Sequence, residues 1–95
     1  MTVYAIAQGK IEDQERFDRY VAEAIPTLTA HNVKVLALDE SPVIVEGSID
    51  YPRTVVLEFE SADAFHRWYD SPEYQEAKKI RLPAADLRAA LVHGL

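Results

Sequence analysis

The sequence predicts an α+β domain of the ferredoxin-like class, with the element order β-α-β-β-α-β and a four-stranded antiparallel sheet. Segments rich in β-branched residues alternate with segments whose apolar residues recur every three or four positions. These segments form two βαβ halves of similar length, which is the ferredoxin-like pattern. The chain has 95 residues, sufficient for one domain and too few for two, so residues 1–95 are expected to fold as one unit.

The first half begins with residues 3–11, whose β-branched and small apolar side chains predict a strand. Asp13 can cap the helix that follows, because its carboxylate can accept hydrogen bonds from the free N–H groups of the first turn. Pro26 lies within this helix and is expected to kink it, and Asn32 is expected to end it in the left-handed conformation. One apolar stripe follows the helix: Phe17, Tyr20, Val21, Ala24, Ile25 and Leu28.

The remaining strands are expected at residues 33–38, 54–59 and 88–93. The segment 54–59 has the strongest strand pattern and is expected to lie centrally in the sheet. A short extra strand is expected at residues 43–46, ending at Gly47.

The second helical region is expected to be split in two. Ser61 can cap its first part, whose apolar residues are Ala62, Phe65, Trp68 and Tyr69. Ser71 can cap its second part, with Pro72 at the first helical position, where the missing proline N–H costs nothing. This second part is expected to stop before Pro83.

Both faces of the predicted sheet are apolar, which indicates a homodimer. On the first strand, Val3 and Ala5 alternate with Tyr4 and Ile6, and the strands at 54–59 and 88–93 alternate in the same way. Right-handed βαβ crossovers place both helices on one face, so no helix remains for the other. An exposed apolar face usually marks an interface, and two copies packed through their bare faces would cover it. The alternative is a monomer with a mildly apolar open face.

Composition and charge exclude several classes of function. The chain has no cysteine, which excludes disulfides, thiolate catalysis and Cys-ligated metal sites. No apolar run approaches the roughly 20 residues of a membrane span, and the N-terminal segment lacks the basic region of a secretory signal. We therefore expect a cytoplasmic protein without a membrane partner. The net charge of −6 and the absence of a strongly basic cluster argue against nucleic acid.

No cofactor or metal ion is expected from the motifs. The chain lacks a Gly-rich phosphate loop and a nucleophile elbow. The three histidines, His31, His66 and His93, have no short ligand spacing, and His31 is explained by its place at a helix end.

Several segments resemble a known family. They are Glu46-Gly47, Pro52-Arg53, residues 56–61, residues 68–75 with the sequence WYDSPEYQ, and Arg81. Together they are similar to the bacterial domain-of-unknown-function family numbered 1330, which belongs to the dimeric α+β barrel superfamily. The resemblance implies the fold and the dimer. It implies little about chemistry, because the family has no assigned function and its distant relatives include monooxygenases, isomerases and haem-degrading enzymes.

Glu58 is the candidate catalytic residue. By alternation it shares a face of a central strand with Thr54 and Val56, and Gln8 on the first strand can lie nearby. A partly desolvated carboxylate has a raised pKa and suits acid–base work. The structural alternative is an ion pair with an arginine, Arg53 or Arg88, or a solvated position at the end of the strand.

The candidate ligand-binding residues are basic and aromatic. Arg53 and Arg81 could clamp a carboxylate with their planar guanidinium groups, or could form ordinary ion pairs. Tyr69 and Tyr74 flank the break between the two short helices and could line an aromatic pocket. Trp68 is expected to be a core residue, because it shares a helix face with Phe65.

Two functional hypotheses follow from the sequence. The first is a small-molecule enzyme or binder with a pocket between sheet and helices in each subunit, using Gln8, Arg53, Glu58, Tyr69 and Tyr74. In it, Glu58 would be a base and Arg53 would anchor an anion. The second is a non-catalytic structural or regulatory dimer without a substrate.

Overall fold

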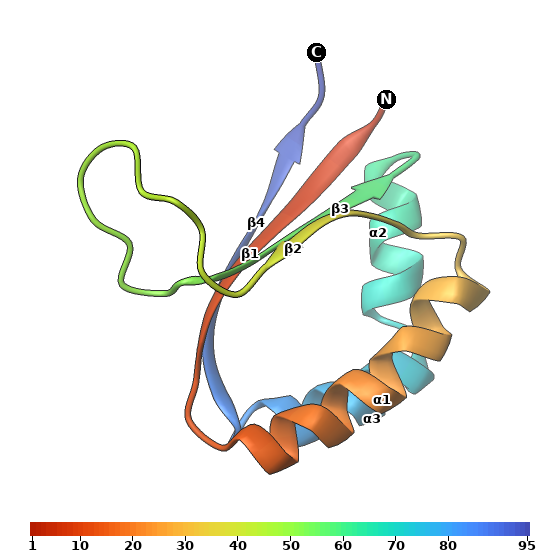
Figure 1. Ribbon diagram of the computed structural model, residues 1–95. Coiled ribbons are helices and arrows are strands. Elements are labelled where there is room, and N and C mark those ends of the chain that lie inside the picture. The colour runs from red at the N-terminus through yellow and green to blue at the C-terminus, as the bar shows by residue number, and fades with distance from the viewer.

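Three helices cover one face of a four-stranded antiparallel sheet in the computed structural model, which describes residues 1–95 (Figure 1). The sheet order is β2-β3-β1-β4, so the ferredoxin-like class predicted from the sequence is confirmed. None of the helices is both long and apolar enough to span a membrane. The elements, in chain order, are β1 (Val3–Ile11), α1 (Gln14–Ala30), β2 (Lys34–Asp39), β3 (Arg53–Phe59), α2 (Ala62–Tyr69), α3 (Pro72–Arg81) and β4 (Ala85–His93).

The helix boundaries follow the predicted capping residues. The Asp13 carboxylate accepts a hydrogen bond from the Arg16 backbone N–H at the start of α1. Asn32 follows the end of α1 with a φ of 55°, the left-handed conformation expected there. The helix continues past Pro26 to Ala30, so the proline does not end it. Ser61 and Ser71 cap α2 and α3 as predicted.

Two strand predictions need correction. Residues 43–46 are not a strand but part of the connection from β2 to β3, which projects away from the helices (Figure 1). The β-branched residues there find no neighbouring strand to pair with, so their local preference is not realised. β4 begins at Ala85 rather than at residue 88, because Ala85 and Asp86 pair with the end of β1.

The core lies between the sheet and the helices. Pairs of residues directly opposite on the central strands, Val3 with Phe59 and Ala5 with Leu57, point to the helices and are buried. The helices contribute buried Trp68 to this core, together with Phe17, Ala24, Tyr74 and Ala77. This packing fixes the position of α1 and α3 over the sheet.

The opposite face of the sheet has no helix over it. Ile6 lies directly opposite Val56 on β3 and Ala90 on β4, while Tyr4 lies opposite Val92. Ile6 and Val92 are exposed to solvent in the single chain. The prediction of a second apolar face is therefore confirmed. We call this surface the open face.

Candidate functional site

A cavity of about 400 Å³ lies between α1 and the strands β2 and β3. Its walls are mainly aliphatic, and exposed Ile25, Val35 and Leu38 stand at its solvent side. We call it the main cavity. Its lining residues are Tyr20, Val21, Ala24, Ile25, Leu28, Thr29, Val33, Val35, Leu38, Arg53, Val55, Leu57 and Trp68. An apolar hollow with few polar groups is typical of a small-molecule site.

A smaller space of about 100 Å³ adjoins the main cavity on the side of α3, and we call it the inner chamber. Tyr20, Arg53, Val55, Leu57 and Trp68 line both spaces. The inner chamber is richer in polar groups, since Tyr69, Tyr74 and Arg81 also line it. These hydroxyl and guanidinium groups are hydrogen-bond donors, which suit an anion or a carbonyl oxygen.

Two tyrosines join α1 to α3 at the inner chamber. The hydroxyl oxygens of Tyr20 and Tyr74 lie 2.9 Å apart, within hydrogen-bonding distance. Burial raises the pKa of the Tyr74 phenol above its usual range, and the neighbouring Tyr20 adds to the effect. Tyr74 therefore stays neutral and can act as a hydrogen-bond donor or acceptor.

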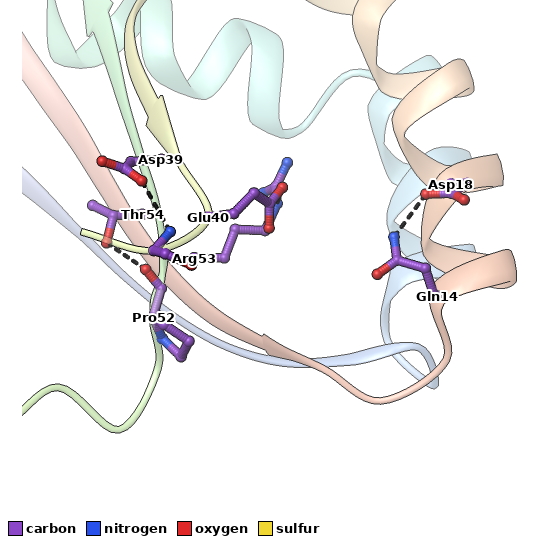
Figure 2. A network of polar contacts seen from close by, with 8 residues as sticks. Gln14, Asp18, Asp39, Glu40, Pro52, Arg53 and Thr54 are labelled. Atoms are coloured by element: carbon purple, nitrogen blue, oxygen red, sulfur yellow. Dashed lines mark hydrogen bonds and ion pairs between the residues drawn. The ribbon is translucent and has the colours of Figure 1, made fainter. Parts of the chain in front are cut away.

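Arg53 lies on the helix side of the sheet and already has a carboxylate partner. Its position at the start of β3 places it on the same face as Val55 and Leu57. Its Nε donates a hydrogen bond of 3.1 Å to Glu40 Oε1, and Figure 2 shows the two side chains close together. Its guanidinium carbon also lies 4.7 Å from the centre of the Phe17 ring. The chain itself thus balances much of this positive charge.

Arg81 is the last residue of α3 and has no such partner. The residue is only 8% exposed, and its Nε has no hydrogen-bond partner. No carboxylate of the chain lies within ion-pair distance of it. The nearest aromatic face belongs to Tyr20, whose ring centre is 6.0 Å from the guanidinium carbon. A largely buried cation without a counter-charge, one of whose N–H groups has no partner, is costly and calls for an explanation.

Trp68 is buried as predicted and also forms part of the cavity wall. Its indole Nε1 donates a hydrogen bond of 3.0 Å to Thr27 Oγ1, and its ring centre lies 4.2 Å from that of Tyr74. Tyr69 stacks on Phe65 with 5.3 Å between ring centres. These contacts hold the aromatic side of the inner chamber in place.

The remaining two candidates, Gln8 and Glu58, lie on the open face rather than beside the cavity. Gln8 lies between Thr54 on β3 and Arg88 on β4. Glu58 forms an ion pair with a lysine, Lys34, at 3.5 Å between Oε2 and Nζ, and not with either arginine considered from the sequence. The structure therefore brings Arg53, Tyr69 and Tyr74 together and separates them from Gln8 and Glu58.

Sequence reasoning missed one member of the site and underestimated another. Tyr20 was expected only as part of the apolar stripe of its helix, yet its hydroxyl reaches Tyr74. The available signal was the hydroxyl itself, since a tyrosine on a buried helix face needs a hydrogen-bond partner. The burial of Arg81 had no local signal, because it depends on how α3 packs against α1.

The sheet order and the helix layer define a ferredoxin-like α+β domain, a fold shared with the solved structures described below. Within that class, the chain belongs to the family described as domain of unknown function DUF1330, whose model matches residues 2–95. The family resemblance stated from the sequence is thereby confirmed. No curated protein matches the chain.

Solved structures share the fold at low sequence identity. A protein of unknown function from Rhodopseudomonas palustris superposes with a TM-score of 0.82 at 20% identity, covering 99% of this chain and 82% of that one. A dimeric ferredoxin-like protein of unknown function from Jannaschia sp. CCS1 gives 0.75 at 14% identity, covering 99% and 100%. SnoaB, a cofactor-independent oxygenase from Streptomyces nogalater, gives 0.68 at 12% identity, covering 99% and 93%. At these identities the likeness establishes the fold.

Proposed function

We propose that this protein is a cytoplasmic homodimer in which each protomer binds a small, largely apolar molecule between the sheet and α1. The observation that carries this proposal is the main cavity, about 400 Å³ of apolar space beside the buried polar groups of the inner chamber. A cavity of this size and composition matches those that hold small organic ligands. The cytoplasmic location rests on the sequence alone.

The open face supports the dimer. It carries a patch of apolar side chains around Ile6, and a lone chain would leave that patch in water. The apolar loop residues Val43, Ile44 and Val45 are also exposed, on the connection that projects away from the helices (Figure 1). The neighbour from Jannaschia sp. CCS1 is described as dimeric, which favours a second copy of this chain as the occupant. Pairing through the open face leaves the helix side free for the ligand.

An enzymatic role on the bound molecule is the second candidate. It is favoured by the Tyr20–Tyr74 pair, because hydroxyl groups beside a cavity can donate hydrogen bonds to an oxyanion that develops on a substrate. A structural neighbour, SnoaB, is described as a cofactor-independent oxygenase. The opposing hypothesis is a structural or regulatory dimer without a ligand.

Binding of the neutral dye N-phenyl-1-naphthylamine tests the cavity. The dye fluoresces in apolar surroundings, and we expect saturable binding of one molecule per protomer. Leu38→Trp should weaken it, because Leu38 lines the main cavity. Leu82→Trp is the matched control, since Leu82 lies outside both spaces and is similarly exposed, 61% against 54% for Leu38. Absence of saturable binding, or equal loss in both variants, would contradict the proposal and favour the dimer without a ligand.

A further inference from the structure

We infer that the bound molecule is an apolar organic anion, and that Arg81 in the inner chamber binds its charged group. The inference rests on the proposed function, because it specifies the chemistry of the molecule in the same cavity. It is carried by a buried cation that the chain leaves without a counter-charge.

The unpaired state of Arg81 stands out among the cations near the site. Arg53, which lines the same chamber, has Glu40 as partner. The exposed cations Arg16, Lys34 and Lys79 also have carboxylate partners, although water could solvate them. Arg81 is more buried than any of these and has no ion pair. Other cations of the chain also lack an ion pair, but Arg81 is the only charged residue that is buried, so it has the greatest need of an anion.

The surroundings of Arg81 do not supply the missing charge. No aspartate or glutamate lines the inner chamber. The Tyr20 ring, at 6.0 Å, lies at the outer limit of a cation–π contact. Tyr74 stays a neutral phenol, because its burial disfavours the phenolate. An external anion would complete this arrangement.

The two spaces match the two parts of such a molecule. The inner chamber, about 100 Å³, has room for roughly three water volumes, which is enough for a carboxylate-sized group. The guanidinium of Arg81 presents a planar fork to that group, and the Tyr20 and Tyr74 hydroxyls border it. The apolar body of the molecule would occupy the adjoining main cavity.

Two dyes that differ by one charge test the inference. The first is 8-anilinonaphthalene-1-sulfonate, and the second is N-phenyl-1-naphthylamine, which has the same ring skeleton without the sulfonate. We expect the anionic dye to bind the protein at least about tenfold more tightly than the neutral dye. Arg81→Met should abolish this preference and leave the affinity for the neutral dye within about twofold. Arg19→Met is the matched control, since Arg19 is exposed on α1 and lines neither space.

Stability in the absence of dye gives a second readout. Because Arg81→Met removes an uncompensated buried charge, the variant should melt at the same temperature as the parent or higher. A clearly lower melting temperature would assign Arg81 a structural role and overturn the inference.

The failures of the two proposals are distinguishable. If neither dye binds saturably, the proposed cavity function is wrong. If both dyes bind the parent equally, or if Arg81→Met weakens both alike, the inferred anion site is wrong while the cavity function stands.

Discussion

The Tyr20 hydroxyl on α1 and the Tyr74 hydroxyl on α3 lie 2.9 Å apart, and their rings meet edge to face with 6.3 Å between centres. Tyr74 is almost completely buried and touches Trp68 on its other side. The pair thus ties the two long helices together directly over the inner chamber. Stability and the geometry of the site depend on the same contact.

Removal of the Tyr74 hydroxyl should cost stability modestly. Tyr74→Phe keeps the ring but removes the hydrogen-bond partner of the Tyr20 hydroxyl. Because Tyr20 is only half-buried, water can partly replace that partner, and the free energy of unfolding should fall by about 1 kcal/mol. Urea denaturation at neutral pH measures this change. Tyr20→Phe should give a similar loss, and a double variant should lose less than the sum of both, because the two hydroxyls share one hydrogen bond. Strict additivity would contradict the contact.

The raised pKa of Tyr74 also predicts that the protein loses stability at alkaline pH. Its pKa is raised from 10.0 in the folded protein, so below about pH 10 the phenol is neutral in both the folded and unfolded states and folding carries no penalty. Above that pH the unfolded state releases the proton and the folded state does not, so stability falls as pH rises toward the raised pKa. Absorbance of tyrosinate measures this ionisation, and comparison of the parent with Tyr74→Phe isolates the signal of Tyr74. That signal should appear only as the protein unfolds. Its appearance in the folded protein would contradict the burial of Tyr74.

Trp68 should be essential for stability. Trp68→Ala leaves a large hole beside Phe59 and Tyr74, and should lower the free energy of unfolding by about 3–5 kcal/mol. Thr27→Val removes the acceptor of the indole N–H together with the hydrogen bond that the Thr27 hydroxyl donates to the Ala24 carbonyl, and should cost less, about 1–3 kcal/mol. Chemical denaturation of both variants measures the difference. An unchanged midpoint for Trp68→Ala would mean that the side chain is not in the core.

Glu58 should have little effect on either stability or dye binding. Its partner Lys34 lies on the edge strand β2 and is 73% exposed in its side chain in the single chain, against 26% for Glu58, so at the sheet edge water can solvate the lysine when the carboxylate is neutralised. Glu58→Gln should therefore change the free energy of unfolding by less than about 1 kcal/mol. Lys34→Gln is the control and should behave alike. Loss of dye binding in Glu58→Gln but not in Lys34→Gln would mean that Glu58 takes part in the ligand site.

The sequence predicts the elements of this fold well because their signals are local. The Asp13 cap and the left-handed Asn32 were recognised from residue type, and the central place of the segment 54–59 from its apolar pattern. The prediction of an extra strand at residues 43–46 was wrong, because a strand needs a neighbouring strand to pair with and local preference does not supply one.

The candidate site was only partly predictable. Alternation along β3 already places Arg53 and Glu58, five positions apart, on opposite faces of the sheet, and a pocket that contains both is inconsistent with that period. The unpaired state of Arg81 could not be foreseen, because it is set by the packing of α3 against α1 and by the position of every carboxylate in the folded chain.

The most direct test concerns the open face. In the proposed dimer a second copy covers that face, and the helix side of each protomer stays free for the ligand. Size-exclusion chromatography with light scattering measures the mass of the particle in solution. At micromolar concentration we predict twice the chain mass of 10.7 kDa, about 21 kDa. A single species of 10.7 kDa would contradict the account, since the apolar patch around Ile6 would then face water.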